Sequence, residues 1–295
     1  LGHVKRGEDG KRPLVAGLYS DTVFHGDNSG SMGSMGRAPE DGGREFAKQY
    51  RDFSDTNPDA KTHLTFGVFS TDYQLVFEGD PAKMSEADVD RCAHAMRPTN
   101  STKFYDTAVG QIKAQAVRIR QKYEELPLNI KRLVSKREFA SVVFATLTDG
   151  QDNMSSLCGE ADLKAAFQEH KDEFGATILF LAANMNAQEV GSRYGLDYNN
   201  CLQMGSDQVY SAGAFKAVTQ VALREASSGG QCSGLVPPPP MFSACLRQSS
   251  CSQTEASQYG AQIPGVPSNV PRSSTAPTSG SLPSSRPGRL LRQNA

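Results

Sequence analysis

The sequence has little net charge, no long hydrophobic run and few cysteines. Its 295 residues carry a formal net charge of −1, so no strong field draws the chain toward nucleic acid or a membrane surface. The longest apolar stretch, residues 177–183, is far too short to cross a bilayer, and no segment has the pattern of a signal peptide. We therefore expect a cytoplasmic protein that binds no nucleic acid and inserts into no membrane.

The cysteines are scattered, and no two of them form a C-x-x-C pair. No histidine tract accompanies them, so a zinc site is not expected. The first three lie in or beside predicted helices and strands and are expected to be buried thiols, whereas the last three lie in the C-terminal region. The six are Cys92, Cys158, Cys201, Cys232, Cys245 and Cys251.

Hydrophobic residues make up only 38% of the chain, and the shortage is concentrated in residues 229–295. Ser, Pro, Gly and Gln dominate there, so the segment cannot bury enough apolar surface to offset the entropy lost on ordering. We expect it to be a disordered tail. Residues 1–13 are charged and contain glycine, and we expect them to form a flexible arm. The remaining residues, 14–228, are predicted to form one domain.

Segments typical of strands and of helices alternate along this domain. Residues 139–148 are almost continuously apolar, as in a buried central strand of a parallel sheet. Residues 63–70 and 74–78 form a predicted β-hairpin. The alternation predicts an α/β fold with a doubly wound, mostly parallel sheet and helices on both faces. The other predicted strands are 22–26, 178–183 and 202–205, and the predicted helices are 43–53, 85–96, 104–125, 161–174, 186–194 and 212–227.

Oxygen-bearing side chains alternate with other residues just after the first predicted strand, at Asp27, Ser29 and Ser31. Ligands of doubly wound sheets bind at the carboxyl ends of strands, and one carboxylate with two hydroxyls suits a small hard cation. Thr102 precedes a predicted helix, and Asp149 follows the strongest predicted strand. Both can therefore reach the same edge of the sheet.

This order, D-x-S-x-S followed by a lone Thr and then a lone Asp, resembles the metal-ion-dependent adhesion site of the von Willebrand factor type A (vWA) family. The matching residues are Asp27, Ser29, Ser31, Thr102 and Asp149, and the resemblance covers roughly residues 14–227. It implies a Rossmann-like fold in which the three hydroxyls coordinate Mg²⁺ or Mn²⁺ directly and the two aspartates bind directly or through water. One coordination position stays open for a Glu or Asp side chain of a protein partner. The resemblance therefore implies a binding module and not an enzyme.

Each part of this pattern has a plainer interpretation when it is taken alone. Asp27 and Ser29 can form an ordinary turn between a strand and a helix. Thr102 can cap the helix that follows it, and Asp149 can belong to a simple turn. Only their conjunction in the order of the family favours a metal site.

Two neighbouring features depart from the family pattern. His25 and Gly26 stand where the family usually has apolar residues. His25 shares a strand face with Asp27, and for it we favour a packed, hydrogen-bonded histidine over a metal ligand. Residues 31–36 repeat Ser-Met-Gly twice, which predicts a flexible loop after the motif.

Two other functions remain as alternatives. An Asp after the first strand is also found in haloacid-dehalogenase-type phosphatases, which depend on Mg²⁺, but these need a second Asp two residues later, where this chain has Ser29. A serine hydrolase would need the spacing G-x-S-x-G, which residues 26–30 lack. A scaffold could act through the four prolines at 237–240, because a polyproline helix docks on aromatic grooves, although short proline runs are common in such tails.

Overall fold

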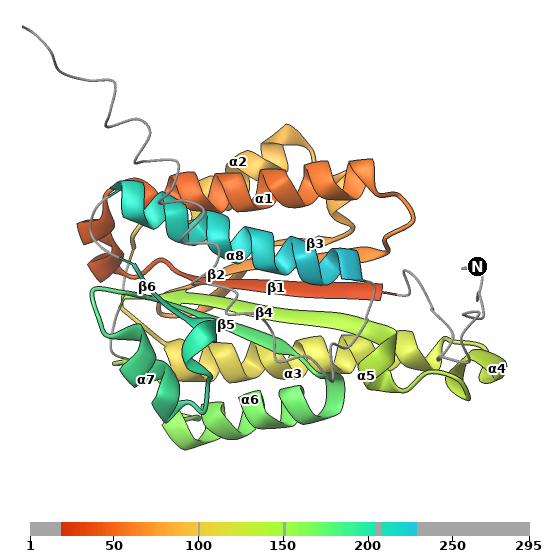
Figure 1. Ribbon diagram of the computed structural model, residues 1–295. Helices are drawn as coiled ribbons and strands as arrows, with labels where there is room; N and C mark the ends of the chain where they lie inside the picture. The colour runs from red at the N-terminus through yellow and green to blue at the C-terminus, as the bar shows by residue number, and fades with distance from the viewer. Residues whose placement is uncertain (1–18, 100, 150–151, 205–207, 229–295) are drawn as a thin grey trace, which may run out of the picture.

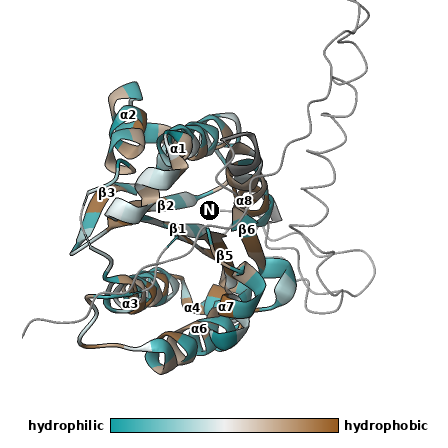
Figure 2. Ribbon diagram, turned by 90° about the vertical axis from the view of Figure 1, so that its left-hand side faces the viewer, coloured by the Kyte–Doolittle hydropathy of each residue, from teal (hydrophilic) through white to brown (hydrophobic). Residues whose placement is uncertain are grey.

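A computed structural model describes residues 19–99, 101–149, 152–204 and 208–228. In these residues the strands form one sheet between two layers of helices (Figures 1 and 2). The strand order is β3-β2-β1-β4-β5-β6, and within this sheet only the edge strand β3 runs antiparallel to its neighbour. The predicted doubly wound α/β fold is confirmed. The strands are β1 (Tyr19–Asp27), β2 (Thr62–Phe69), β3 (Tyr73–Gly79), β4 (Ala140–Thr148), β5 (Thr177–Ala183) and β6 (Cys201–Met204).

The helices divide between the two faces of the sheet, and each layer closes over its own apolar cluster. On one face the rings of Phe24 and Phe66 stack with centroids 4.6 Å apart, and on the other Phe144 meets Phe167 edge-on at 6.0 Å. The chain therefore buries two cores, one on each side of the sheet. The first face carries α1 (Ala38–Thr56), α2 (Glu86–Ala95) and α8 (Gln208–Ser228), and the second carries α3 (Phe104–Glu124), α6 (Glu160–Phe174) and α7 (Ala187–Arg193).

Every predicted strand and helix is present, but some ends differ. Helix α1 begins at Ala38, before the predicted start at 43, because Pro39 occupies its first turn and acidic residues follow. The pair Gly42-Gly43 hides this turn in the sequence, yet a Cβ at Gly42 would collide with the ring of Phe215 on α8. Gly175 closes α6 in the left-handed conformation (φ 67°), directly after the predicted end at 174.

Several short helices have no counterpart in the sequence pattern. Phe139, predicted to begin a strand, ends α5 instead, because Ser135 and Glu138 form a capping box that starts this helix. The short helices are η1 (Gly30–Met35), η2 (Pro81–Lys83), α4 (Leu128–Lys131), α5 (Lys136–Phe139) and η3 (Tyr198–Asn200).

Strand β1 is buried along its whole length although many of its side chains are polar. Thr22 shares a hydrogen bond of 2.7 Å with Tyr50. The carboxylate of Asp21 accepts two hydrogen bonds from Arg118, of 2.8 and 2.9 Å, and a third of 2.9 Å from Gln115. Burial alone would raise the pKa of Asp21, but the hydrogen bonds and charge of Arg118 outweigh it and hold that pKa below its usual value. Thr22 and Asp21 are therefore paired inside the fold, whereas the buried hydroxyl of Ser20 on the same strand has no hydrogen-bond partner.

The predicted arm, residues 1–13, and the predicted disordered tail, residues 229–295, lie outside the described residues. The domain boundaries at 14 and 228 stay a prediction. Among the helices that the structure describes, none combines the length and apolar character needed to cross a membrane.

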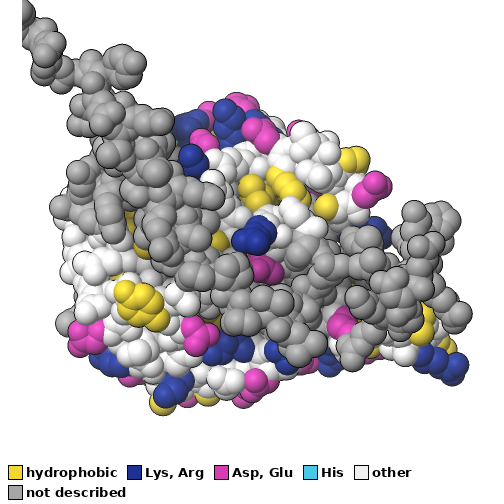
Figure 3. Space-filling view, viewed as in Figure 1, with side chains coloured by type: hydrophobic (Ala, Val, Ile, Leu, Met, Phe, Trp, Pro, Cys, Tyr) yellow, Lys and Arg dark blue, Asp and Glu magenta, His cyan; other side chains and the backbone are white. Residues whose placement is uncertain are grey.

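The cysteines differ in burial, and the charges on the visible surface are mixed in sign (Figure 3). Cys92 and Cys201 are buried, as predicted, whereas Cys158 is partly exposed because it lies on the loop before α6. On the part of the face that is visible in Figure 3, Lys and Arg side chains are interspersed with Asp and Glu. No field of one sign dominates that part of the surface.

Candidate metal centre

The candidate site lies where the chain order changes direction in the sheet. From β1 the chain proceeds to β2 on one side, while β4 lies on the other side of β1 and leads on to β5. In doubly wound sheets ligands bind at the carboxyl ends of the strands at such a point. Here β1 ends at Asp27 and β4 ends at Thr148, whose Oγ1 donates a hydrogen bond of 2.7 Å to Oδ2 of Asp27. Figure 2 looks at the molecule from this end.

Four of the five predicted ligands form one connected group of oxygen atoms. The backbone N–H of Ser29 donates to Oδ1 of Asp27 at 2.7 Å. The hydroxyls of Ser29 and Ser31 share a hydrogen bond of 3.0 Å. Ser31 Oγ then donates to Oδ1 of Asp149 at 2.7 Å. Side chains that are 118 positions apart in the sequence thus meet at one edge of the sheet.

Thr102 lies on the neighbouring loop and is 3% exposed. The backbone N–H of Lys103 donates to the carbonyl of Ser70 at 2.8 Å, and Ser70 follows the residue that pairs with Asp27. The N–H of Thr102 donates to Oδ1 of Asn153 at 3.0 Å. The loop is therefore held against the same edge of the sheet, although no hydrogen bond among the described residues joins the hydroxyl of Thr102 to the other four side chains.

Helix α3 is not capped by Thr102, so the plainer interpretation of this residue is wrong. The N-cap residue is Lys103, and it makes no side-chain cap hydrogen bond. Instead Oδ2 of Asp152 accepts from the N–H of Tyr105 at 2.8 Å. The first turn of α3 is thus satisfied from the loop after β4.

Asn28 is a structural residue of the site that the sequence motif did not reveal. Its Nδ2 donates to the carbonyl of Ala95 at 3.0 Å, and its N–H donates to the carbonyl of Phe69 at 2.9 Å. Its own carbonyl accepts from the N–H of Thr99 at 2.7 Å and from the hydroxyl of Thr99 at 3.1 Å. Asn28 therefore joins the turn after β1 to the loop that carries Thr102. Such a contact between distant loops leaves no periodic signal in the sequence.

The repeated Ser-Met-Gly segment, residues 31–36, does not form the predicted flexible loop. Its first five residues belong to η1, a 3₁₀ helix. Because this helix has three residues per turn, the repeat places Met32 and Met35 on the same side. Met32 is fully buried and Met35 is 3% exposed, and both pack into the core under α1. The repeat therefore anchors the turn that carries the candidate ligands.

The two serines of the repeat share another side of this helix. Ser31 faces Asp149, as described above, and the hydroxyl of Ser34 accepts a hydrogen bond of 3.0 Å from Nδ2 of Asn184. Asn184 follows β5 and has a positive φ of 56°. The helix η1 thus bridges the ends of β4 and β5.

The electrostatics of the site fit a bound cation. Burial raises the pKa of Asp27 to about 6, although hydrogen bonds from Ser29 and Thr148 oppose the shift. Burial also raises the pKa of Asp149, and its Oδ2 is a buried atom without a hydrogen-bond partner. Among the described residues no salt bridge reaches either carboxylate. A divalent cation would supply the missing positive charge.

The donor set is made of oxygen atoms only. Across the described ranges no three His, Cys, Asp or Glu side chains gather as they would around zinc. The candidate site has two carboxylates, and its remaining donors are hydroxyls. Hard oxygen donors favour Mg²⁺, Mn²⁺ or Ca²⁺ over softer metals.

His25 is a packed, hydrogen-bonded residue, as predicted. Its Nδ1 lies 3.0 Å from Oγ1 of Thr146, and its Nε2 lies 3.1 Å from Oγ1 of Thr107. The ring stacks on Phe69 with centroids 4.2 Å apart. Burial lowers the pKa of His25 to about 3, so the imidazole is neutral at pH 7. Both ring nitrogens have partners, and neither is available to a metal ion.

We expect His25→Phe to flatten the pH dependence of stability. The pKa of His25 is lower in the fold than its ordinary 6.5, so its contribution is complete above pH ~6.5 and is lost as the pH falls. Removing it should reduce the slope of the unfolding free energy by about 1.4 kcal/mol per pH unit between pH ~6 and ~4. Urea denaturation of both proteins across this range measures the slope. Parallel curves would show that His25 titrates normally in the fold.

The strand order and the placement of the motif decide the fold. A central β1 ends in the D-x-S-x-S turn, this turn faces the end of β4, and an antiparallel edge strand completes the sheet beside β2. The domain has a Rossmann-like, doubly wound α/β fold. This is the architecture that the resemblance in the sequence implies.

Solved structures similar to this domain include proximal thread matrix protein 1 from the mussel byssus with a zinc-occupied MIDAS motif. It is 19% identical, with a TM-score of 0.43, and the match covers 70% of this chain and 46% of that one. The vWF domain of the pilus tip protein Mfa5 from Porphyromonas gingivalis is 11% identical over 70% of this chain and 95% of its own, with a TM-score of 0.44. A von Willebrand factor type A protein from Catenulispora acidiphila is 14% identical over 72% and 44%, with a TM-score of 0.40.

The chain thus spans less than half the length of the mussel protein. No protein-family model and no curated protein matches the chain.

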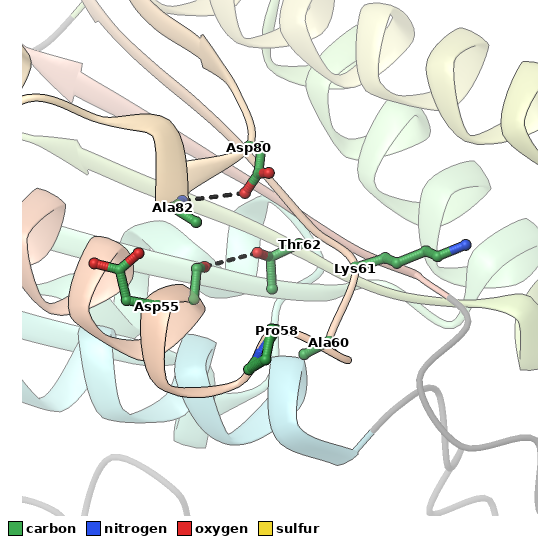
Figure 4. A pocket seen from close by; sticks show the side chains of 8 residues that line it. Asp55, Pro58, Ala60, Lys61, Thr62, Asp80 and Ala82 are labelled. Atoms are coloured by element: carbon green, nitrogen blue, oxygen red, sulfur yellow. Dashed lines mark hydrogen bonds between the residues drawn. The ribbon is translucent and has the colours of Figure 1, made fainter. Parts of the chain in front are cut away.

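A pocket of about 350 Å³ opens at the opposite end of the domain, between the end of α1 and the start of β2 (Figure 4). Three of its polar side chains are hydrogen-bonded within the fold. The hydroxyls of Ser54 and Thr62 share a hydrogen bond of 2.7 Å, and Oδ1 of Asp80 accepts from the N–H of Ala82 at 3.1 Å. No candidate metal ligand lines this pocket.

Proposed function

We propose that this domain binds Mg²⁺ or Mn²⁺ and uses the ion to recognise a carboxylate side chain of a protein partner. The ligands would be Asp27, Ser29, Ser31, Thr102 and Asp149. The observation that carries the proposal is a pair of carboxylates, both with raised pKa, that no described salt bridge neutralises. They are connected through the backbone N–H of Ser29 and the hydroxyls of Ser29 and Ser31.

The neutral ligands explain why a partner would be anionic. The bound ion would act as a Lewis acid toward an oxygen ligand from outside the domain. Three hydroxyls add no negative charge, so two aspartates at most balance the ion within the domain. The N–H of Ser29 and the hydroxyl of Thr148 fix both oxygens of Asp27. An external carboxylate would complete the coordination, and the ion would attract it where an aspartate binds only through water.

The chemistry around the site favours binding over hydrolysis. A phosphatase of the haloacid-dehalogenase type needs a general acid two residues after Asp27, and the residue there is Ser29. His25 is the nearest imidazole in the sequence, and both of its nitrogens already have threonine partners. The prolines at 237–240, on which the scaffold alternative depends, lie outside the described residues.

Ser31 and Ser34 offer a matched test of the metal ligands. They occupy equivalent positions of the repeat, but only Ser31 contacts Asp149. We expect Ser31→Ala to weaken Mg²⁺ binding to the metal-free full chain by about tenfold or more, which is about 1.4 kcal/mol. Ser34→Ala should leave the affinity within about a factor of two. Titration calorimetry measures both, and equal losses, or no Mg²⁺ binding to the wild-type chain, would contradict the proposal.

The partner is tested with the same full-length chain. Proteins captured in Mg²⁺ or Mn²⁺ should be released by chelator, and Asp27→Ala should capture none of them. Replacing the contacting Glu or Asp of a captured partner should abolish its binding. By contrast, turnover of p-nitrophenyl phosphate in Mg²⁺ that disappears in Asp27→Asn would favour the phosphatase alternative.

A further inference from the structure

The loop after β4 is fastened to the start of α3. The backbone N–H groups of Asn153 and Met154 both donate to the carbonyl of Thr102 at 3.1 Å. The N–H of Asp106 donates to the hydroxyl of Ser155 at 3.0 Å. The segment that carries a candidate metal ligand and the loop beside it therefore form one unit.

Asp106 fastens the same loop from the other direction. Its carboxylate accepts from the N–H groups of Ser156 and Leu157 at 3.1 Å each and from that of Cys158 at 2.7 Å. Burial would raise the pKa of Asp106, but these three backbone hydrogen bonds and the charge of Lys103 outweigh it, and the pKa is lowered. The backbone around Leu157 is thus fixed by a charged acceptor.

This fixed loop presents apolar side chains to solvent. Leu157 is 84% exposed, and Met154, three residues earlier on the loop, is 44% exposed. Single exposed apolar residues are ordinary on protein surfaces. Here two exposed apolar residues lie on one hydrogen-bonded loop, and the backbone N–H of Met154 is bonded to the carbonyl of Thr102. The stability of the fold does not require either apolar side chain at the surface. Little conformational entropy is lost when a ligand covers them, because their backbone is already ordered.

We propose that Leu157 and Met154 form a second contact site for the ligand of the metal centre. The ligand would be a peptide segment in which an apolar side chain such as Leu, Met or Phe lies within two residues of the Glu or Asp that binds the ion. The inference rests on the proposed function, because it places the apolar contact beside the ion. Burying the exposed part of Leu157 favours such a peptide over one with a polar neighbour by about tenfold.

The charges around this loop do not attract an acidic peptide by themselves, so such a peptide would bind here only when the ion is present. Asp106 and Asp152 hold the loop by accepting hydrogen bonds from its backbone N–H groups, and Asp152 also accepts from the N–H of Tyr105 on α3. Lys103 Nζ lies 3.8 Å from Oδ2 of Asp106 and offsets part of this charge, but two carboxylates beside one ammonium leave a net negative charge that, without the ion, would repel an acidic segment. The apolar contact therefore adds affinity to a carboxylate that the ion has already attracted, and it does not replace the ion.

The molecule provides a matched control for this surface. Leu128 is 73% exposed, and it begins α4 at the other end of the domain, away from the candidate metal centre (Figure 1). Leu157→Ser and Leu128→Ser remove similar side chains, both on the surface. Neither residue is a candidate metal ligand, so both variants should keep the Mg²⁺ affinity of the wild-type chain.

The test is a selection from a phage library of nine-residue peptides with Glu or Asp fixed at the centre and random flanks. The full chain is immobilised in Mg²⁺, and parallel selections use chelator and the Asp27→Ala variant. We expect enrichment of Leu, Met or Phe within two positions of the centre. A selected peptide should bind Leu157→Ser about tenfold more weakly, while its affinity for Leu128→Ser stays within about a factor of two.

The outcomes separate the two proposals. Acidic peptides that need Mg²⁺ but show no apolar preference, or that bind Leu157→Ser as tightly as wild type, would overturn the apolar contact and leave the metal site intact. Equal selection in Mg²⁺ and in chelator would overturn the proposed metal-dependent recognition, and the apolar contact with it. Equal weakening by Leu157→Ser and Leu128→Ser would also refute the contact, because only Leu157 lies on the loop that is bonded to the segment of Thr102.

Discussion

Asp27→Asn is expected to stabilise the metal-free domain and, at the same time, to abolish its response to Mg²⁺. The carboxylate of Asp27 is fully buried, and burial raises its pKa to about 6 from an ordinary value of 3.8. At pH 7 the empty domain therefore holds a charge that would be better solvated in the unfolded chain. The difference corresponds to at most about 3 kcal/mol, and we expect a gain of about 1–3 kcal/mol. The asparagine can still accept from Ser29, and the hydroxyl of Thr148 can accept from its amide.

The pH dependence follows from the same carboxyl group. Its pKa is higher in the fold than in the unfolded chain, so it contributes stability below pH ~4 that is lost as the pH rises to ~6. The advantage of Asp27→Asn in chelator should therefore be largest above pH ~6 and shrink below it. Mg²⁺ must displace the proton of Asp27, so its affinity should fall about tenfold per pH unit below pH ~6.

Thermal and urea unfolding in chelator and in Mg²⁺ measure both halves of this prediction. Wild type should gain stability on adding Mg²⁺, whereas Asp27→Asn should gain none. Thr65→Val, on the neighbouring strand β2, is a suitable control because this buried threonine hydroxyl has no partner and is not a candidate ligand. It should keep the Mg²⁺ response. An Asp27→Asn variant that is less stable than wild type in chelator at pH ~7.5 would show that the carboxylate is neutralised within the protein.

The sequence predicted the architecture well because strands β4 and β5 are apolar. Residues 139–148 and 178–183 read directly as buried parallel strands, and β4 and β5 lie there. Strand β1 was predicted too short, since Asp21 and its polar neighbours do not resemble a central strand. Their partners lie on distant helices, as with Arg118 and Gln115, and no local pattern encodes such pairs.

The residues of the candidate site also differ in how far the sequence could predict them. Asp27, Ser29 and Ser31 are adjacent and form a visible motif, and the position of Asp149 after the strongest strand brought it to the same edge. Thr102 could be placed only through the resemblance to the vWA family. The role of Asn28 depends on contacts with loops about 70 residues away, so no spacing rule could reveal it.

The 3₁₀ helix η1 shows why a glycine-containing repeat was misread. Ser-Met-Gly twice over is typical of a flexible loop when composition is considered alone. The period of three matches the turn of a 3₁₀ helix, which buries Met32 and Met35 and leaves the serines free to bond the ends of β4 and β5. A period of three in such a segment is therefore a usable signal for a short anchored helix.

Arg118→Met should cause the largest loss of stability among the single substitutions considered. Arg118 makes two hydrogen bonds to Asp21, whose carboxylate is fully buried in the middle of the sheet. Removing the guanidinium leaves a buried charge whose remaining donors, within the described part of the chain, are Gln115 and Tyr19. Breaking such a pair by removing one partner costs about 3–5 kcal/mol, although the pair itself contributes much less net stability. Urea unfolding at pH ~7 measures the loss.

The double variant Asp21→Asn/Arg118→Met separates the cost of leaving Asp21 without its partner from the net stability that the ion pair contributes. It removes the charge together with its partner, and we expect it to recover at least half of the stability that Arg118→Met loses. Arg120→Met is the matched control on the same helix: its partner Glu173 lies near the surface, and the side chain of Arg120 is 49% exposed. That variant should lose about 1 kcal/mol or less.

If Arg118→Met cost no more than Arg120→Met, Asp21 would have to be neutral in the fold, and its pKa would be raised by burial and not lowered by Arg118. The loss in Arg118→Met would then also be independent of pH, whereas an uncompensated carboxylate predicts that the variant regains stability as the pH falls and Asp21 takes up a proton.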